Sequence, residues 1–282
     1  MRVFRNLLRS SRWLGFAIVL MATATHLSAA SFATVDFPGA THTGAQGINN
    51  QGVIVGFYVT TAGVFHGFVS NGDSFATVDF PGAIGTSANG INNSGAIVGN
   101  YADTTSRQHG FLYESGSFTT IEFPGANSTE AFGINESGDI AGFYVDTSGV
   151  NHGFLLSKGG FTSIDFPGAV HTQAYGINGA GQVVGIGFLA SSWQGFSWSK
   201  DRFTSIDFPG SNFTAATGVN KARAVVGFYF TTNYHGFLLD RNGFQAVDVP
   251  GAVYTQPRGI NGNGDVVGQY SDGARLHGFL MN

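Results

Sequence analysis

Residues 31–282 are built from short apolar blocks separated by polar turns. Blocks rich in Val, Ile, Phe and Tyr lie between Gly, Asn, Pro and Ser, which is the pattern of β-strands joined by turns. Four such blocks follow one another in "SANGIN" (87–92), "AIVGNY" (96–101), "HGFLY" (109–113) and "SFTTIEF" (117–123). The intervening "NNSG" and "ESG" have the turn residues of hairpins. We therefore expect four antiparallel strands in each unit of about 43 residues.

This unit occurs six times. The segment "SFATVDFPGA" appears at 31–40 and again at 74–83. The Phe-Pro-Gly or Val-Pro-Gly element begins at Phe37, Phe80, Phe123, Phe166, Phe208 and Val249. An asparagine follows each proline by eleven residues, at Asn49, Asn92, Asn135, Asn178, Asn220 and Asn261. Four-stranded repeats of this length are typical of β-propeller blades. The predicted fold is an all-β, six-bladed β-propeller of four-stranded antiparallel blades, with repeats starting near residues 31, 74, 117, 160, 202 and 243.

The two ends of the repeat region predict how the ring closes. The region begins on a fourth strand, "SFATVDF", and ends on a third strand, "HGFLMN". Pairing of these two strands would complete the sixth blade and leave no open edge. Glycine also recurs at four positions of each copy, which indicates turns with positive φ or close approach between backbones.

Residues 1–30 lie outside the repeat and have the pattern of a secretory signal peptide. A basic leader with Arg2, Arg5, Arg9 and Arg12 precedes a short apolar run and the small residues Ser28, Ala29 and Ala30. An uncleaved N-terminal anchor is the alternative. We expect a single propeller domain at 31–282 that is secreted or extracellular, with the periplasm and cell surface also open, and no membrane span in the mature chain.

Composition narrows the possible partners and chemistries. Without the leader, nine Lys and Arg face 17 Asp and Glu, a formal charge of −8, which disfavours nucleic acid as a partner. The absence of cysteine excludes disulfides, thiol chemistry and Cys-ligated metals. We expect neither a cofactor nor a metal site.

A repeated histidine and a repeated acid predict a polar contact within each blade. "HGF" places histidines at His66, His109, His152, His235 and His277, and Gln194 takes this position in the fourth copy. The expected partners are Asp79, Glu122, Asp165, Asp248 and, across the ring closure, Asp36, with Asp207 opposite Gln194. A turn centred on Asn71 and Gly72 would put His66 opposite Thr77 and diagonal to Asp79. We interpret these pairs as structural, and the repeated asparagines as turn formers.

Variation among the copies indicates where a ligand would bind. The connections between second and third strands vary in length, and those from one blade to the next vary in their letters. Both kinds of connection lie on one face of a propeller, which we call the loop face. The turns that join the first to the second strand and the third to the fourth strand lie on the other face, which we call the hairpin face. Binding residues concentrate on such loops, and the candidates assigned to the loop face are His42, Tyr175, Trp193, Tyr234, Tyr254 and Arg258. Aromatic rings beside hydrogen-bonding groups suit sugars, so the expected partner is a carbohydrate or a cell-surface protein.

No residue pattern predicts catalysis. The sequence has no nucleophile elbow, phosphate loop or HExxH motif, and its four glutamates fall on different parts of the strand map, with Glu130 on the loop face. The favoured function is a non-catalytic binding or scaffold module. The alternatives are a polysaccharide-acting propeller hydrolase or lyase and a purely structural envelope protein.

The repeat "FTxIDFPGAxxTxAxGINxxGxxVGxYxxxxxxxHGFLxxxG" resembles that of the bacterial extracellular HAF-repeat proteins, although this chain has "HGF" where that family has His-Ala-Phe. The resemblance covers residues 31–282 and rests on the spacing of the three elements. It implies export and a propeller-like repeat fold, and it supplies no catalytic residue.

Overall fold

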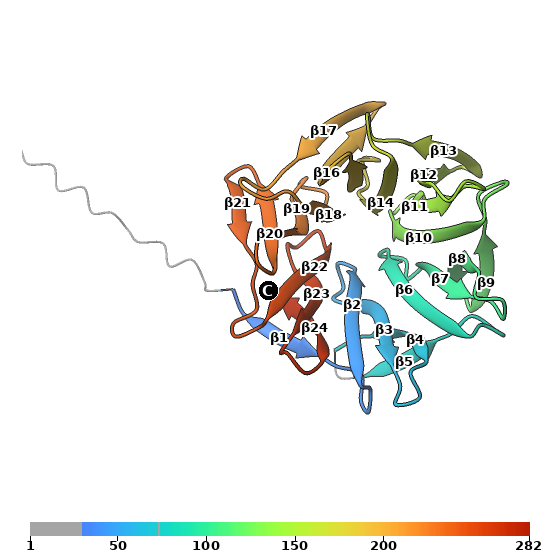
Figure 1. Cartoon of the computed structure of the whole chain (residues 1–282). Coiled ribbons are helices and arrows are strands. Elements are labelled where there is room, and N and C mark those ends of the chain that lie inside the picture. The colour runs from blue at the N-terminus through green and yellow to red at the C-terminus, as the bar shows by residue number, and fades with distance from the viewer. Residues whose placement is uncertain (1–29, 73) are drawn as a thin grey trace, which may run out of the picture. The chain divides into compact units, whose positions relative to one another are not determined.

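The computed structural model describes residues 30–72 and 74–282. These residues form 24 strands in six four-stranded sheets, and no helix occurs among them. Figure 1 shows the sheets arranged as blades around a ring. The predicted six-bladed β-propeller of antiparallel blades is confirmed. The predicted signal peptide lies outside the described residues except for Ala30.

Each blade begins with its innermost strand and ends with its outermost strand (Figure 1). Blade 1 contains β2 (His42–Ile48), β3 (Ile54–Val59), β4 (Phe65–Ser70) and β5 (Phe75–Val78). Blade 2 contains β6 (Gly85–Ile91), β7 (Ile97–Ala102), β8 (Gln108–Glu114) and β9 (Ser117–Ile121). Blade 3 contains β10 (Ser128–Ile134), β11 (Ile140–Val145), β12 (Asn151–Ser157) and β13 (Gly160–Ile164). Blade 4 contains β14 (His171–Ile177), β15 (Val183–Leu189), β16 (Ser192–Ser199) and β17 (Arg202–Ile206). Blade 5 contains β18 (Thr214–Val219), β19 (Val225–Phe230), β20 (Tyr234–Asp240) and β21 (Gly243–Ala246). Blade 6 contains β22 (Tyr254–Ile260), β23 (Val266–Ser271), β24 (Leu276–Met281) and β1 (Phe32–Val35).

The N-terminal strand closes the ring as predicted. β1 pairs antiparallel with β24, with Phe32 opposite Met281. Ser31 and Asn282 exchange backbone hydrogen bonds of 3.2 and 3.1 Å beyond the strand ends. The Phe32 ring also lies 5.9 Å from the Phe279 ring, centroid to centroid. The outermost strand of blade 6 therefore comes from the start of the repeat region, and its other three strands come from the end of that region.

One phenylalanine and one glycine organise the interior of every blade. The third strands bury a fully inaccessible ring at Phe68, Phe111, Phe154, Phe196, Phe237 and Phe279. Each ring lies over a glycine of the second strand. A Cβ on Gly56 would lie 2.0 Å from the Gly44 carbonyl oxygen and 2.8 Å from the Phe68 ring. Only glycine leaves room for this approach, so the predicted close backbone contact is confirmed at this position.

The innermost strands begin earlier than the sequence analysis expects. In blade 2 the strand was expected at 87–92, but β6 starts at Gly85 and already pairs there with Ala102. Each innermost strand carries a β-bulge, which in blade 2 leaves Asn89 without a partner between Ala88 and Gly90. A bulge re-aims the side chain of the extra residue. Residues 85 and 86, expected to belong to the connection between blades, are therefore part of the innermost strand. The bulge within each innermost strand places one side chain per blade at the axis.

Candidate functional site

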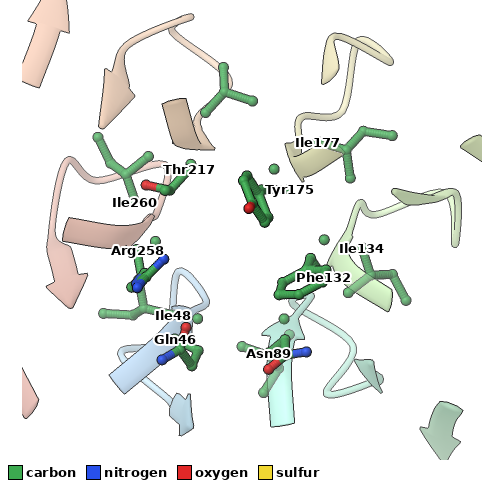
Figure 2. Close-up of a pocket in the computed structure, with 18 residues that line it drawn as sticks. Gln46, Ile48, Asn89, Phe132, Ile134, Tyr175, Ile177, Thr217, Arg258 and Ile260 are labelled. Atoms are coloured by element: carbon green, nitrogen blue, oxygen red, sulfur yellow. The ribbon is translucent and has the colours of Figure 1, made fainter. Parts of the chain in front are cut away.

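The six bulged residues line a channel along the axis of the ring. Figure 2 shows their side chains around the opening: Gln46, Asn89, Phe132, Tyr175, Thr217 and Arg258. They surround a cavity of about 90 Å³. A ring of branched apolar side chains lies next along the axis, formed by Ile48, Ile91, Ile134, Ile177, Val219 and Ile260. We call the first set the axial ring and the cavity the axial cavity.

The axial ring has a polar side formed by blades 6 and 1. Arg258 Nη2 donates to Gln256 Oε1 over 3.1 Å. Gln269 Nε2 donates to the same oxygen over 2.8 Å, and Gln46 Nε2 donates to Gln269 Oε1 over 3.4 Å. Asn89 continues this polar side in blade 2, where its Nδ2 donates to Asn100 Oδ1 over 2.8 Å.

Blades 3 and 4 give the axial ring an aromatic side. The Phe132 ring stacks on Phe143 at 5.5 Å and meets Tyr175 edge-on at 5.1 Å. The Tyr175 hydroxyl donates to Gln173 Oε1 over 2.6 Å. Burial raises the pKa of Tyr175 to about 12, so the phenol is neutral and acts as a donor. The axial cavity is therefore amphipathic, with amides and a cation facing aromatic rings.

Arg258 has no anionic partner among the described residues. Its guanidinium carbon lies 5.0 Å from the centroid of the Phe228 ring, a cation–π geometry. Its Nε is buried and has no hydrogen-bond partner. Burial lowers the pKa of Arg258 below its ordinary value, although the nearby phenols of Tyr175 and Tyr254 oppose this effect. The side chain is partly exposed to the channel and remains a cation.

Glu130 is a buried acid that the sequence analysis placed on the loop face. It lies within β10, opposite Phe143. Burial raises its pKa from the ordinary 4.5 to about 7. The proximity of Glu130 also contributes to the raised pKa of Tyr175. Glu130 thus belongs to the aromatic side of the channel, and near neutral pH its protonated and ionised forms are both populated.

The repeated asparagines form a continuous hydrogen-bonded ring on the hairpin face. The Nδ2 of each asparagine donates to the backbone carbonyl of its equivalent in the next blade, and the last one, Asn261, donates back to Asn49. The donor–acceptor distances are 3.2, 3.2, 3.3, 3.1, 3.1 and 3.0 Å for the donors Asn49, Asn92, Asn135, Asn178, Asn220 and Asn261. Their Oδ1 atoms accept backbone N–H groups of the following turn, as at Asn49 from Gln51 and Val53. The predicted turn role is confirmed, and the bond to the next blade is an additional role that the sequence analysis missed.

The structure brings together every predicted histidine and acid. The Nδ1-to-carboxylate distances are 2.7 Å for His66 and Asp79, 2.6 Å for His109 and Glu122, 2.7 Å for His152 and Asp165, 3.1 Å for His235 and Asp248, and 2.7 Å for His277 and Asp36. Gln194 Nε2 donates to Asp207 over 2.5 Å. Each histidine also stacks on a tyrosine of the second strand.

The expected register of this hairpin was wrong by two residues. Phe68 lies opposite Thr77 and Gly67 opposite Val78, so His66 faces Asp79 directly and not Thr77. The turn at 71–74 is longer than the two-residue turn assumed, and turn length sets register.

Three blades add a second acid to the histidine. These acids come from the connection between the second and third strands. Their distances to the histidine Nε2 atoms are 3.0 Å from Asp103 to His109, 3.5 Å from Asp146 to His152 and 3.2 Å from Asp272 to His277. Burial lowers the pKa of His277, but its hydrogen bonds to Asp36 and Asp272 outweigh this and raise it overall. No group of three or more His, Cys, Asp or Glu in the described chain is arranged to hold a metal ion.

The loop face carries the exposed apolar side chains of the described residues. These are Val64, Phe65, Ile84, Val170, Phe230 and Val253. All lie in, or next to, the connections that join second to third strands or one blade to the next. The larger exposed apolar side chains therefore lie on the loop face, distributed over several blades.

Trp193 borders a hollow on this face that differs from the equivalent region of the other blades. The hollow has a volume of about 310 Å³ and is lined by Ser192, Trp193, Gln194 and residues 207–212. Only two residues separate β15 from β16, whereas five separate β7 from β8. Blade 4 therefore lacks the longer connection that carries Asp103 in blade 2. We call this region the blade-4 hollow.

Five of the six predicted ligand-binding residues gather around one buried cluster that contains Phe228. Tyr175 and Tyr234 pack with Trp193 against this cluster. The rings of Tyr234 and Tyr254 lie 6.5 Å apart, and the guanidinium of Arg258 lies over the Phe228 ring. Tyr175 and Arg258 were assigned to the loop face, but both lie in strands and line the axial channel. Only His42, exposed at the start of β2, is outside this group.

No family model and no curated protein matches this sequence. Among solved structures, the chain is similar to TolB from Acinetobacter baumannii, with a TM-score of 0.55, 15% identity and 81% of this chain covered. The match spans 63% of the length of that protein. The β-propeller domain of the Trilobed protease from Pyrococcus furiosus gives a TM-score of 0.54 at 10% identity, covering 86% of this chain and 94% of that one. The Aleuria aurantia lectin in complex with Fucα1-6GlcNAc gives 0.52 at 11% identity, covering 84% and 91%. At these identities the similarity shows the propeller fold alone.

Proposed function

We propose that this propeller is an exported, non-catalytic binding module that takes a carbohydrate at the blade-4 hollow on its loop face. The carrying observation is that this hollow combines the Trp193 ring with closely spaced hydrogen-bonding groups, on the face that holds the exposed apolar side chains. A sugar offers an apolar ring face and hydroxyl edges, which such a surface complements.

The chemistry of the blade-4 hollow supports this assignment. The Trp193 ring is held by Phe188 at 4.8 Å and by Phe213 at 6.2 Å, so it presents a fixed surface. Gln194 and Asp207 bond to each other and keep further acceptor and donor positions free for hydroxyl groups. Burial raises the pKa of Asp207 although the Gln194 bond opposes this shift. A volume of about 310 Å³ lies near the lower end of small-molecule sites.

Export is the second part of the proposal. It is supported by the basic and apolar pattern of residues 1–30 and by the resemblance to exported HAF-repeat proteins. No helix in the residues that the structure describes is long and apolar enough to span a membrane. Sequencing the N-terminus of the protein recovered outside the cytoplasm tests this part, and we expect it to begin at Ser31.

Binding is tested by applying the purified protein to a glycan array. The affinity for each glycan that binds is then measured by calorimetry. Trp193→Ala should weaken binding about tenfold or more, since central aromatic contacts dominate such sites. Because Trp193 also packs against its neighbours, Asp207→Asn provides a variant of unchanged shape that should weaken binding as well. Phe65→Ala removes a half-exposed ring from the same face at blade 1 and should leave affinity unchanged. Loss of binding in Phe65→Ala alone would move the site to blades 1 and 2. If the protein binds no glycan on the array, the proposal is refuted.

A further inference from the structure

We propose that the axial cavity is a second ligand site, specific for a small monocarboxylate that Arg258 binds. This site lies at the axis and shares no residue with the blade-4 hollow, so it goes beyond the carbohydrate proposal and can fail or succeed independently of it.

The first argument is the unbalanced charge of Arg258. Arg258 is partly buried, and no described carboxylate forms an ion pair with it. An opposite charge nearby stabilises a cation that has lost part of its hydration. Nη2 donates to Gln256, while Nε is enclosed and out of reach of a ligand in the cavity. A carboxylate in the cavity would supply the missing charge through charge-assisted hydrogen bonds with the accessible side of the guanidinium.

The second argument is that the surrounding residues fix the guanidinium. The face of the Phe228 ring lies 5.0 Å from its carbon, and the oxygen of Gln256 that it contacts is held in turn by Gln269. Restricting the rotamers of a binding side chain lowers the entropy lost on binding. The arginine is therefore held in place before any ligand arrives.

Size and polarity set the ligand class. A volume of about 90 Å³ is far below the ~300 Å³ at which sites for larger organic ligands begin, so the space beside Arg258 favours a ligand of a few heavy atoms. Phe132 and Tyr175 give the cavity an apolar wall away from Arg258 (Figure 2). A short alkyl chain carrying one carboxylate matches both walls. Inorganic anions match only the cationic one.

The test is calorimetry of the purified protein with propionate, acetate and phosphate, and with propionamide as the neutral isostere of propionate. The titration is run at pH 6, below the pKa of about 7 of Glu130, because an ionised neighbour would repel an anion. We expect propionate to bind more tightly than acetate, and both more tightly than propionamide. Equal or tighter binding of phosphate, or no binding of propionate, would overturn the proposal.

Two variants separate this site from adventitious binding. Arg258→Gln should weaken propionate binding about tenfold or more, because the charge-assisted hydrogen bonds are lost. Arg241→Gln removes the same charge from an exposed turn and should leave binding unchanged. Arg258→Gln should also fold with an undiminished melting temperature, since it removes a partly buried charge that has no ion-pair partner among the described residues. A large loss of stability in this variant would make Arg258 a structural residue and would contradict the proposal, as would unchanged propionate affinity.

Discussion

Replacing Asn49 by alanine should destabilise the propeller by about 3 kcal/mol. The side chain is 6% exposed, and its Oδ1 accepts the backbone N–H groups of Gln51 and Val53 over 3.1 and 3.0 Å. Its Nδ2 donates to the carbonyl of Asn92 in the next blade over 3.2 Å. Each buried group left without a partner costs about 1–3 kcal/mol. The Asn92 carbonyl keeps a second bond, from the Gly95 N–H over 3.1 Å, and water can reach a turn at the surface. We therefore take the low end of the range, about 1 kcal/mol, for each of the three lost bonds.

The measurement is thermal and urea unfolding followed by near-ultraviolet circular dichroism. A loss of about 3 kcal/mol corresponds to a fall in melting temperature of about 6–12 °C for a chain of this size. Asn50→Ala changes the neighbouring, exposed asparagine of the same turn, whose Oδ1 accepts the Gly262 N–H over 2.7 Å. This variant should cost only about 1 kcal/mol, because water can replace a bond that is exposed. Asn178→Ala breaks the equivalent ring bond in blade 4 and should match Asn49→Ala.

Asn49→Asp separates the turn role from the ring role. A carboxylate keeps the acceptor for the turn but cannot donate to Asn92, and it adds a buried charge beside a carbonyl oxygen. A protonated carboxyl can donate again. The variant should therefore be about as unstable as Asn49→Ala at pH 8 and recover part of the loss at pH 4, compared with the unmodified protein at each pH. Equal effects of Asn49→Ala and Asn50→Ala, or an aspartate variant insensitive to pH, would refute the reasoning.

Three further predictions concern ring closure and pH. Deleting residues 31–40 exposes the edge of β24 and should lower the melting temperature by about 10 °C or more, and an unchanged value in calorimetry would contradict closure by β1. Folding raises the pKa of Glu130 from 4.5 to about 7, so the folded state binds this proton more tightly than the unfolded state does. The free energy of unfolding should therefore fall by about 3 kcal/mol as pH rises from 4 to 8, and urea titrations of Glu130→Gln should not show that fall. Folding also raises the pKa of His277 through Asp36 and Asp272. The stabilisation from protonated His277 is therefore complete below pH 6.5 and disappears as pH rises through the pKa of the folded state. Hydrogen exchange of β24 amides should accelerate over that range more in the unmodified protein than in His277→Gln, once the intrinsic pH dependence of exchange is removed.

The blade count and the closure could be predicted because repetition amplifies weak local signals. A single "HGF" or "FPGA" carries little information, but the constant spacing of such elements over six copies fixes the order of the strands. The spacing of thirteen positions from His66 to Asp79 likewise predicted the correct partners. Their register was missed because it depends on the turn at 71–74, whose length the hydrophobic pattern does not specify.

The axial ring could not be predicted from strand patterns, because it depends on a bulge. The unpaired residue of each innermost strand looks like any other polar or aromatic residue in the sequence, and only the pairing of Ala88 and Gly90 with successive partners shows that Asn89 is extra. A signal was nevertheless present. The residue before Gly-Ile-Asn or Gly-Val-Asn differs in all six copies, although its neighbours hardly change. Attributing that variation to the connections between blades concealed its meaning.

The distribution of repeated and unrepeated residues follows from the geometry of a closed ring. A residue that contacts its equivalent in the next blade, as Asn49 contacts Asn92, takes part in a chain of six contacts that must all fit, which favours one residue type throughout. The axial ring faces an open channel and escapes this requirement. Thr217 satisfies the same position with bonds from its hydroxyl to two backbone carbonyls, at 3.2 and 2.8 Å, so the fold needs no guanidinium there. Since Arg258 carries a partly buried, unpaired charge at the channel that neither the bulge nor the neighbouring blade requires, binding of an anion from solution is the explanation that its surroundings support.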